Sequence, residues 1–363
     1  MTPSLKRFFT KDLGLDLGTA NSLVYEKDKG IIFREPSVVA VKKNTNQIVA
    51  LGQEAEQMIG RTPGNIVALR PLREGVIANY ELTKELIRHL LKKALKRRFG
   101  FRPRVVVSIP TGITGVERRA VLDATLGAGA GEAYLIEEPV AAAIGAGLPV
   151  QDAVGNMVIN IGGGTTDVAV LSLGGVVAGL SIRVGGDAMD TAIIRFIRRQ
   201  YNLLIGERSA EELKIELGSA YPLPNEEERT GEARGRDQVS GLPKNVVINA
   251  REIREALKEP ITTIINAIRQ VVEKTPPELV ADIMDQEIIM TGGGTLLAGF
   301  DRLVARELSM NVKLAEDPMA CVVKGAGKTL EHLDALKRAL VGSKKSTRYG
   351  GTVTLADETF ENP

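Results

Sequence analysis

Three turns in this chain have the composition of phosphate-binding loops. Residues 18–21, 162–165 and 292–295 are rich in glycine and small polar residues, and each turn follows a short apolar run. Glycine permits positive φ angles and a close approach of the backbone, so such a turn can direct N–H groups at phosphate oxygens. A single glycine turn is weak evidence, because the same residues also serve to reverse a strand. Three turns in one chain are hard to explain by strand reversal alone.

The first two turns lie in segments that repeat one design. Residues 13–25 and 157–173 each alternate apolar residues on both sides of a small-residue turn, which is the pattern of a β-hairpin. When Asp16 is aligned with Asn160, both segments read apolar, Asp or Asn, apolar, Gly, small, small. The sequence therefore predicts two related halves, each beginning with a glycine-turned hairpin.

Carboxylates near the turns are candidates for the chemistry itself. Phosphoryl transfer depends mainly on positioning and charge neutralisation, and a carboxylate can accept a hydrogen bond from an attacking water. Glu138 stands directly before Pro139, at a predicted helix start. Taken alone, Glu138 also fits an exposed acid that the helix dipole favours. Asp187 and Asp190 follow a further glycine pair, and we expect them to cap a helix rather than to form a subunit contact.

The elements around these residues alternate between strand and helix. Apolar spacing predicts helices over residues 83–98, 117–127, 139–146 and 251–274, and strands over 104–110 and 133–137. Residues 219–245 are rich in Pro, Gly, Glu and Arg, so we expect a loop or an irregular insertion there. The alternation indicates an α/β fold with partly parallel sheets.

Composition excludes several other classes of protein. A length of 363 residues suggests about two domains, and a net charge of +2 gives no general signal for binding polyanions. Trp is absent and aromatic residues make up 4%, so we expect no nucleic-acid partner. One cysteine excludes an intrachain disulfide, which fits a reducing compartment. Neither a membrane-spanning apolar run nor a signal peptide is evident, so we expect a cytoplasmic protein.

The order of the motifs resembles a known superfamily. Residues 15–21, 136–145, 161–167 and 291–294 together resemble the actin, Hsp70 and sugar-kinase ATPase superfamily. Within it, residues 61–65, 70–71, 275–279 and 315–318 resemble the MreB family. The resemblance covers about residues 12–333, with order and spacing kept along nearly the whole chain.

The resemblance implies a two-lobed, actin-like ATPase fold. Two pseudo-symmetric halves, each with a mixed sheet and helices, would surround a central nucleotide cleft. The first lobe would span residues 1–152, with a small insertion subdomain at about 33–78, and the second 153–318, with a small subdomain at about 188–250. A C-terminal helix at 319–340 would return to the first lobe. The polar tail at 341–363 is expected to be disordered.

The resemblance also implies ATP or GTP as ligand, with Mg²⁺, and assigns roles residue by residue. Asp16 would face the water shell of the metal. Glu138 would orient the attacking water, and Thr165 would help to hold that water or the γ-phosphate. The remaining binding residues fall into four sets: Gly18, Thr19, Ala20 and Asn21 in the first phosphate turn; Gly162, Gly163, Gly164 and Thr165 in the second; Glu211, Glu212 and Lys214 on a helix against the ribose and base; and Gly292, Gly293, Gly294 and Thr295 in the adenosine loop.

One position departs from the family pattern. Chains of the MreB family usually carry Asp where this chain has Asn160. Asn cannot supply a negative charge to balance Mg²⁺, although it still donates and accepts hydrogen bonds. We therefore expect nucleotide binding to survive and hydrolysis to be slower. Asp167 is a nearby source of acidity, or else pairs with a basic neighbour.

Two basic segments that contain aromatic residues are candidates for membrane contact. Leu5, Phe8 and Phe9 could share one helix face, flanked by basic residues. Residues 84–104 carry nine Lys or Arg against one acid and include Phe99 and Phe101. A frayed terminus and a solvated basic helix are the alternatives. The family resemblance favours contact with an anionic membrane, strengthened by many copies along a filament.

The resemblance thus predicts a filament-forming NTPase that slowly hydrolyses ATP during polymerisation. Its partners would be further copies of itself, the anionic inner membrane surface, cell-wall synthesis proteins and membrane adaptor proteins. The protein would be cytoplasmic and peripheral on the inner face of the cell membrane, where it would maintain cell shape. A plasmid-segregating actin-like filament and a small-molecule kinase of the same fold remain alternatives. An Hsp70-type chaperone would need a further peptide-binding domain.

Overall fold

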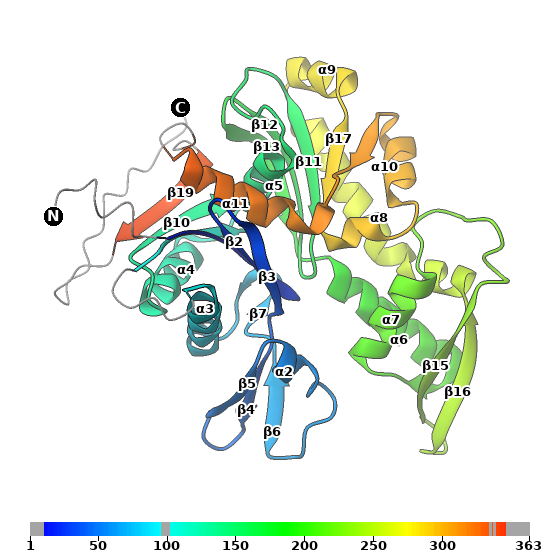
Figure 1. Ribbon diagram of the computed structural model, residues 1–363. Coiled ribbons are helices and arrows are strands. Elements are labelled where there is room, and N and C mark those ends of the chain that lie inside the picture. The colour runs from blue at the N-terminus through cyan, green and yellow to red at the C-terminus, as the bar shows by residue number, and fades with distance from the viewer. Residues whose placement is uncertain (1–10, 96–101, 334–335, 337–338, 346–363) are drawn as a thin grey trace. The chain divides into compact units, whose positions relative to one another are not determined.

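The computed structural model describes residues 11–95, 102–333, 336 and 339–345 (Figure 1). The chain forms two compact units. Unit 1 draws its described residues from Met1–Asp152, Leu173–Gly175 and Ala320–Pro363, and unit 2 consists of Ala153–Ser172 and Val176–Met319. Each unit has its own hydrophobic core.

A six-stranded mixed sheet is the centre of unit 1. Its strand order is β19-β10-β9-β1-β2-β3. β1 pairs antiparallel with β2 and parallel with β9, which in turn pairs parallel with β10. The strands are β1 (Asp12–Leu17), β2 (Asn21–Glu26), β3 (Gly30–Pro36), β9 (Arg104–Ile109), β10 (Glu132–Glu137) and β19 (Leu340–Lys345).

Helices cover both faces of this sheet, as Figure 1 shows. One face packs against α3 (Tyr80–Leu95) and α4 (Gly115–Gly127), and the other against α5 (Glu138–Ala146) and α11 (Cys321–Glu331). The alternation of side chains along β1 explains the two layers. Leu13 and Leu15 point into the core beneath α3 and α4. Gly14 faces α11, where a Cβ atom would lie 2.6 Å from the backbone nitrogen of Gly327.

A smaller sheet follows β3 in unit 1. Its order is β5-β4-β6, and it has a small core of its own that includes Val38, Ala40 and Ala55. Its elements and the hairpin after it are β4 (Val39–Lys42), β5 (Ile48–Leu51), α2 (Gln53–Glu56), β6 (Ile66–Leu69), β7 (Leu72–Arg73) and β8 (Val76–Ile77).

Unit 2 repeats the scheme of a mixed sheet with helices. The main sheet has the order β13-β12-β11-β17-β18, with β11, β17 and β18 parallel and β12 antiparallel to β11. Its strands are β11 (Asn156–Ile161), β12 (Thr166–Ser172), β13 (Gly175–Ile182), β17 (Ile288–Thr291) and β18 (Val312–Leu314). The helices are α6 (Gly186–Tyr201), α7 (Glu207–Leu217), α8 (Ala250–Lys274), α9 (Pro277–Asp285), α10 (Phe300–Leu308) and the short 3₁₀ helices η1 (Gly293–Leu296) and η2 (Pro318–Ala320).

Most of the predicted elements are confirmed. Both glycine-turned hairpins form, as β1–β2 and β11–β12. The predicted strands at 104–110 and 133–137 correspond to β9 and β10, and the predicted helices correspond to α4, α5 and α8. The helix expected at 83–98 is α3 up to Leu95, and its last three positions lie outside the described residues.

The prediction of a loop at 219–245 is wrong for its second half. There, β15 (Thr230–Asp237) and β16 (Pro243–Asn249) form a hairpin, joined to β14 (Leu203–Leu204). The sequence hid this hairpin because Ala233 is its only buried side chain within β15. Gly235 lies where a Cβ would meet the carbonyl oxygen of Leu204 at 2.1 Å, so close strand packing requires glycine there.

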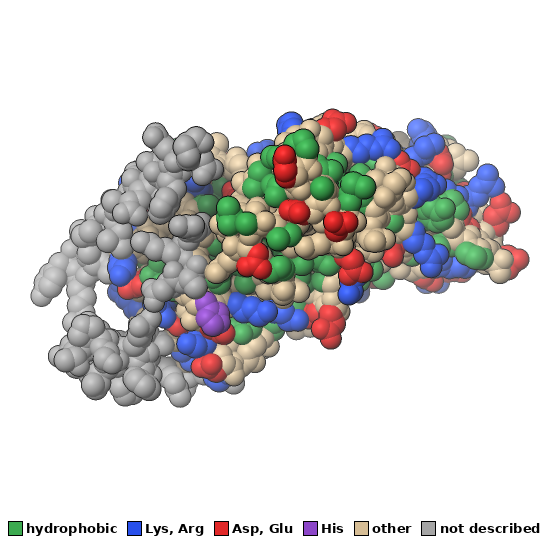
Figure 2. Space-filling model, turned by 90° about the horizontal axis from the view of Figure 1, so that it is seen from above, with side chains coloured by type: hydrophobic (Ala, Val, Ile, Leu, Met, Phe, Trp, Pro, Cys, Tyr) green, Lys and Arg blue, Asp and Glu red, His purple; other side chains and the backbone are tan. Residues whose placement is uncertain are grey.

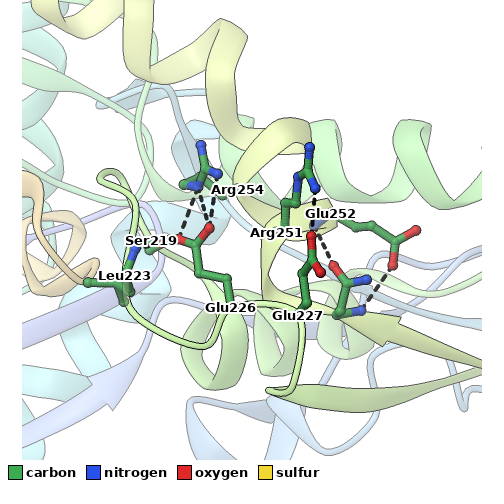
Figure 3. Close-up of polar contacts among 8 residues, drawn as sticks. Ser219, Leu223, Glu226, Glu227, Arg251, Glu252 and Arg254 are labelled. Carbon is green, nitrogen blue, oxygen red and sulfur yellow. Dashed lines mark hydrogen bonds and ion pairs between the residues drawn. The ribbon is translucent and has the colours of Figure 1, made fainter.

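The first half of that segment is irregular, yet its polar side chains fix it in place. Figure 3 shows the Glu226 carboxylate at the centre, accepting hydrogen bonds from the Leu223 N–H at 2.7 Å and the Arg254 Nε at 3.0 Å. Burial opposes ionisation of Glu226, but the bonds from Arg254 and Leu223 outweigh it and lower the pKa of this carboxyl. An ordered loop therefore connects α7 to the hairpin and to α8.

The predictions for the C-terminal part need two corrections. The helix expected over 319–340 is shorter, since α11 ends at Glu331. Residues 340–345, of which 341–345 were expected to belong to a disordered tail, form strand β19 on β10. A run with two lysines looks like a polar tail, but Lys344 and Lys345 form ion pairs with Asp123 and Glu132. Residues 346–363 lie outside the described part.

The surface and the helices add two observations. Basic and acidic side chains both occur across the described part of the face in Figure 2, in keeping with the near-balanced charge. Among the described residues, no helix combines the length and the apolar character needed to cross a bilayer.

Candidate functional site

The polar candidates of unit 1 lie at the carboxyl ends of its parallel strands. Leu15 pairs with Val107, so Asp16 and Ser108 are the next residues on β1 and β9. Ser108 in turn pairs with Ile136 on β10, two residues before Glu138. Parallel strands present their carboxyl ends at one edge of a sheet, which is where α/β proteins bind ligands.

Asp16 is held by a neighbouring hydroxyl and is only partly exposed. The Ser108 Oγ donates a hydrogen bond to Asp16 Oδ1 at 3.0 Å. Burial raises the pKa of Asp16 from its ordinary 3.8 to about 6, although the bond from Ser108 and the charge of Arg34 lower it. A carboxylate in this setting gains from a cation nearby, because the cation offsets its lost hydration.

The first turn is braced by side chains from elsewhere in unit 1. The Ser37 Oγ donates to the carbonyl of Gly18 at 2.6 Å, and the Gly75 N–H donates to the Thr19 Oγ1 at 3.2 Å. The Arg70 guanidinium lies 3.4 Å from the carbonyl oxygens of Thr19 and Ala20. These contacts direct the turn's carbonyls into the protein. Ser37, Arg70 and Gly75 carried no phosphate-binding signal of their own in the sequence.

Glu138 is buried, so the interpretation as an exposed helix-start acid is wrong. It is 9% exposed and opens α5, whose first turn also contains Pro139. The N-terminal end of a helix favours a negative charge, and low exposure strengthens every hydrogen bond that the carboxylate makes. The Glu138 carboxylate is therefore shielded from bulk solvent rather than solvated.

Unit 2 repeats the arrangement around Asp16. Asn160 on β11 pairs with Thr291 on β17 and with Asp167 on β12. The Thr291 Oγ1 donates to the Asn160 Oδ1 at 3.2 Å, as Ser108 donates to Asp16 in unit 1. Cross-strand partners lie on the same face of a sheet, so the fully buried Asp167 is on the same face as Asn160.

The second turn, Gly162 to Thr165, is closed on itself and rests against the start of α6. The Gly162 N–H donates to the Thr165 carbonyl at 2.8 Å. The N–H groups of Gly186 and Asp187 donate to the carbonyls of Gly162 and Gly163 at 3.0 and 2.8 Å. A Cβ on Gly185 would lie 2.6 Å from the Gly162 carbonyl oxygen, so this close approach requires glycine. Thr165 itself is buried.

The third turn packs on the end of β11 and therefore lies next to the second turn within unit 2. Gly292 has φ +85°, and a Cβ there would lie 2.3 Å from the carbonyl oxygen of Ile161. The Thr295 Oγ1 donates to the Gly292 carbonyl at 2.7 Å and fixes η1. Gly293 and Gly294 lie within η1. The predicted second and third turns are thus neighbours.

Lys214 on α7 is held near the second turn by an ion pair with Asp190, which was predicted to cap a helix. Lys214 Nζ lies 2.8 Å from Asp190 Oδ1 and donates to the Gly186 carbonyl at 3.2 Å. Asp190 therefore does not cap α6, whose N-cap is Gly185. Burial raises the pKa of Asp190 to about 6, and the charge of Lys214 opposes this rise. Glu211 and Glu212 are exposed on α7, and Glu212 pairs with Arg208.

The sequence did not reveal which residues hold the predicted ones in place, and it gave Asp190 a different role. Ser108 orients Asp16, Ser37 holds the first turn, and Asp190 holds Lys214. Ser108 alone had a usable signal, a polar residue within an apolar strand. The membrane candidates Leu5, Phe8, Phe9, Phe99 and Phe101 all lie outside the described residues.

The Asp16 carboxylate suits a magnesium ion held through water. Mg²⁺ keeps several waters and is typically held by one or two carboxylates together with phosphates. Asp16 of unit 1 offers a partly buried carboxylate with a raised pKa. In the described ranges, no group of three or more His, Cys, Asp or Glu side chains could hold a metal directly.

Comparison with known proteins gives matches over nearly the whole length. The profile of the MreB/Mbl protein family matches residues 10–338. The cell shape-determining protein Mbl of Bacillus subtilis (strain 168) is 49% identical over 330 residues, 91% of this chain and 98% of Mbl. The cell shape-determining protein MreB of Escherichia coli (strain K12) is 50% identical over 338 residues, 91% of this chain and 97% of MreB.

Solved structures agree with the predicted actin-like α/β fold. MreB5 of Spiroplasma citri bound to ADP has a TM-score of 0.84 at 37% identity, covering 90% of this chain and 97% of that one. The same protein bound to AMPPNP has a TM-score of 0.83 at 36% identity, covering 90% and 98%. The MamK double helical filament has a TM-score of 0.76 at 21% identity, covering 89% and 99%, and bears on the fold alone. The predicted fold class is thereby confirmed.

The raised pKa of Asp16 predicts a pH-dependent gain in stability when its charge is removed. Asp16 has a pKa of about 6 in the folded state and 3.8 in the unfolded state. The folded state therefore loses stability relative to the unfolded state as pH rises between these two values. Asp16→Asn should therefore raise the free energy of unfolding by up to about 3 kcal/mol at pH 8 and not at pH 4, without nucleotide or Mg²⁺, because each pKa unit corresponds to about 1.4 kcal/mol. Urea unfolding at both pH values measures this.

Asp12→Asn is the matched control on the same strand. Asp12 accepts from Arg104 Nε at 2.7 Å, so its neutralisation should lower stability at pH 8. An equal gain for Asp16→Asn at pH 4 and pH 8 would contradict the assignment of a raised pKa.

Proposed function

This chain belongs to the MreB/Mbl protein family, and from that premise we propose that it is a nucleotide-dependent cytoskeletal protein. It binds ATP, or GTP, with Mg²⁺ and polymerises into filaments. One observation carries the proposal. Each unit places a glycine turn directly after a strand whose second-last residue is a hydroxyl-bonded Asp or Asn, Asp16 in one and Asn160 in the other. Nucleotide-bound MreB5 has the same fold, which supports the choice of ligand.

The turns would divide the recognition of the nucleotide. The first turn, Gly18 to Asn21, and the second, Gly162 to Thr165, would cradle phosphate oxygens with backbone N–H groups. Gly292 to Thr295 would face the adenosine, and Glu211, Glu212 and Lys214 would lie along the ribose and base. Mg²⁺ would neutralise phosphate charge when bound, with Asp16 facing its water shell.

Glu138 is the proposed orienting residue for hydrolysis. Its buried carboxylate would accept a hydrogen bond from the attacking water and align the oxygen toward the γ-phosphorus. Thr165, also buried, would hold that water or the γ-phosphate through its hydroxyl. Main-chain pairing of β10 and the first turn of α5 fix Glu138, so little reorganisation is needed when the reaction occurs.

Asn160 would make this hydrolysis slow. Its amide oxygen accepts from Thr291 and carries no formal charge, so it balances a cation less well than a carboxylate. Asp167, its cross-strand partner, leaves a carboxylate on the same face. We propose that binding is retained and that turnover is the property that changes.

Filaments on the membrane are the proposed cellular form. The relatives at about 50% identity are cell shape-determining proteins, which supports a scaffold for cell-wall synthesis at the inner face of the cell membrane. Residues 1–10 contain the basic segment with two Phe residues that we propose as the membrane anchor. We propose that the rest of the protein lies in the cytoplasm. Cell-wall synthesis proteins and membrane adaptors are the proposed partners. A plasmid-segregating filament would not need this segment, and a small-molecule kinase would need neither filament nor lipid.

Restoring a carboxylate at position 160 tests the proposed cause of slow turnover. Asn160→Asp should speed phosphate release about tenfold, because about 1.4 kcal/mol of extra charge stabilisation in the transition state corresponds to a factor of ten. Nucleotide affinity with Mg²⁺ should stay equal or increase. Phosphate release under single-turnover conditions gives the rate, and Asn160→Ser is the neutral control. A rate unchanged by Asn160→Asp would remove Asn160 as the cause.

Co-sedimentation with anionic liposomes tests the scaffold itself. The full chain should pellet with lipid in ATP, and electron microscopy should show filaments on the lipid. Deleting residues 1–10 should abolish lipid binding while filaments persist in solution. A chain that stays monomeric with ATP, with ADP and without nucleotide would exclude the filament and favour a kinase of the same fold.

A further inference from the structure

Strand β10 leads directly to Glu138, and pairing with β19 makes β10 an internal strand of the sheet instead of an edge strand. β10 runs from Glu132 to Glu137 and passes directly into α5, which begins at Glu138. β9 pairs with one side of β10, and β19 pairs with the other. Without β19, β10 would be the edge strand of the sheet. The family profile ends at residue 338, before β19 begins.

The register of β19 brings its first residues to the end of β10 that precedes Glu138. The strands are antiparallel, with Leu340 opposite Ile136 and Gly342 opposite Leu135. Val341 is therefore the extra residue of a β-bulge, and it packs against the core of unit 1. A bulge strengthens the local twist and commonly aims a nearby side chain. This one lies two residues before the proposed functional carboxylate.

One buried ammonium anchors the other end of β19. The Lys344 side chain is 7% exposed and pairs with the carboxylate of Asp123 on α4, across from Ala133 on β10. Lysine is seldom this buried unless its charge is paired. The neighbouring Lys345 pairs with Glu132 at 3.3 Å, but its side chain is 48% exposed. Exposed pairs contribute little, so Lys344 makes the stronger of the two side-chain ion pairs that add to the backbone pairing of β19 with β10.

An edge strand frays more readily than an internal one. Its outward N–H and C=O groups compete for water, and local opening is cheapest where few buried contacts hold the backbone. A carboxylate that must orient a water molecule loses efficiency when its supporting strand opens. Closing the β10 edge removes one such motion at the point where it would affect Glu138.

We propose that β19 is a positioning strand for Glu138, and that Lys344 is the residue that keeps it in place. This inference rests on the proposed hydrolytic role of Glu138. It assigns the C-terminal strand to the rate of the chemical step rather than to nucleotide binding. The proposed phosphate-binding turn of unit 1 follows β1, which is separated from β10 by β9.

Two matched substitutions in the full chain test the proposal. Lys344→Ala should speed hydrogen exchange of the β10 amides at least tenfold and lower kcat for ATP hydrolysis about fivefold, with KM unchanged. Lys345→Ala, next to it but exposed, should leave exchange and kcat within a factor of two. Lys344→Arg keeps the charge and should restore both. A chain ending at Ala339, which lacks β19, should show a larger increase in β10 exchange and a larger fall in kcat, again with KM unchanged.

The outcomes separate this inference from the proposed function. Faster exchange in β10 with unchanged kcat would overturn the positioning role while leaving hydrolysis intact. Unchanged exchange in Lys344→Ala would overturn the role of Lys344, whatever the enzyme does. A fall in kcat accompanied by an equal loss of nucleotide affinity would also overturn it. If the unaltered chain hydrolyses no nucleotide, the proposed function fails, and exchange at β10 alone decides whether Lys344 holds the strand.

Discussion

The parallel register of β1, β9 and β10 is the constraint on which the candidate site of unit 1 depends. Each buried main-chain N–H and C=O group needs a hydrogen-bond partner. A change of register between any two of the three strands would break many of these bonds, so the register is fixed. This register sets Asp16 beside Ser108 and brings Glu138 to the same strand end. The pairing of β11 with β17 repeats this in unit 2, where Asn160 meets Thr291.

The two units differ in charge at this shared position, and the difference has physical consequences. Asp16 is a carboxylate whose pKa burial raises to about 6, so it is poised to gain from a cation. Asn160 is the neutral amide at the matching position of unit 2. The carboxylate nearby belongs to Asp167, its partner on the adjacent strand β12. Charge is thus arranged differently at the ends of the two strands, although both strands pair in the same way with their neighbours.

Much of the fold could be predicted because its signals are local. Apolar alternation around glycine turns found both hairpins, and helical spacing found α3, α4, α5 and α8. The hairpin β15–β16 escaped because its strands are mostly exposed and carry glycines where close packing needs them. β19 escaped because its stability comes from tertiary ion pairs and an existing sheet edge, neither of which a lysine-bearing run reveals.

The candidate site was predictable only in part, for a related reason. Glycine turns and acids after apolar runs carry a sequence signal, so Asp16, Gly162 and Gly292 could be singled out. Partners such as Ser37, Arg70 and Asp190 are common residue types at distant positions, and only the fold brings them to the turns. Burial likewise could not be read from the sequence, and the structure shows only that Glu138 is not an exposed acid.

The most direct test of this account is single-turnover ATP hydrolysis by Glu138→Gln, measured beside Glu137→Gln and with nucleotide affinity determined for both. The account predicts that Glu138→Gln slows hydrolysis about a hundredfold or more, the usual contribution of a positioned acid or base, while affinity changes less than about threefold. Glu137→Gln should stay close to the unaltered chain. Hydrolysis by Glu138→Gln at the unaltered rate would contradict the central assignment of this site.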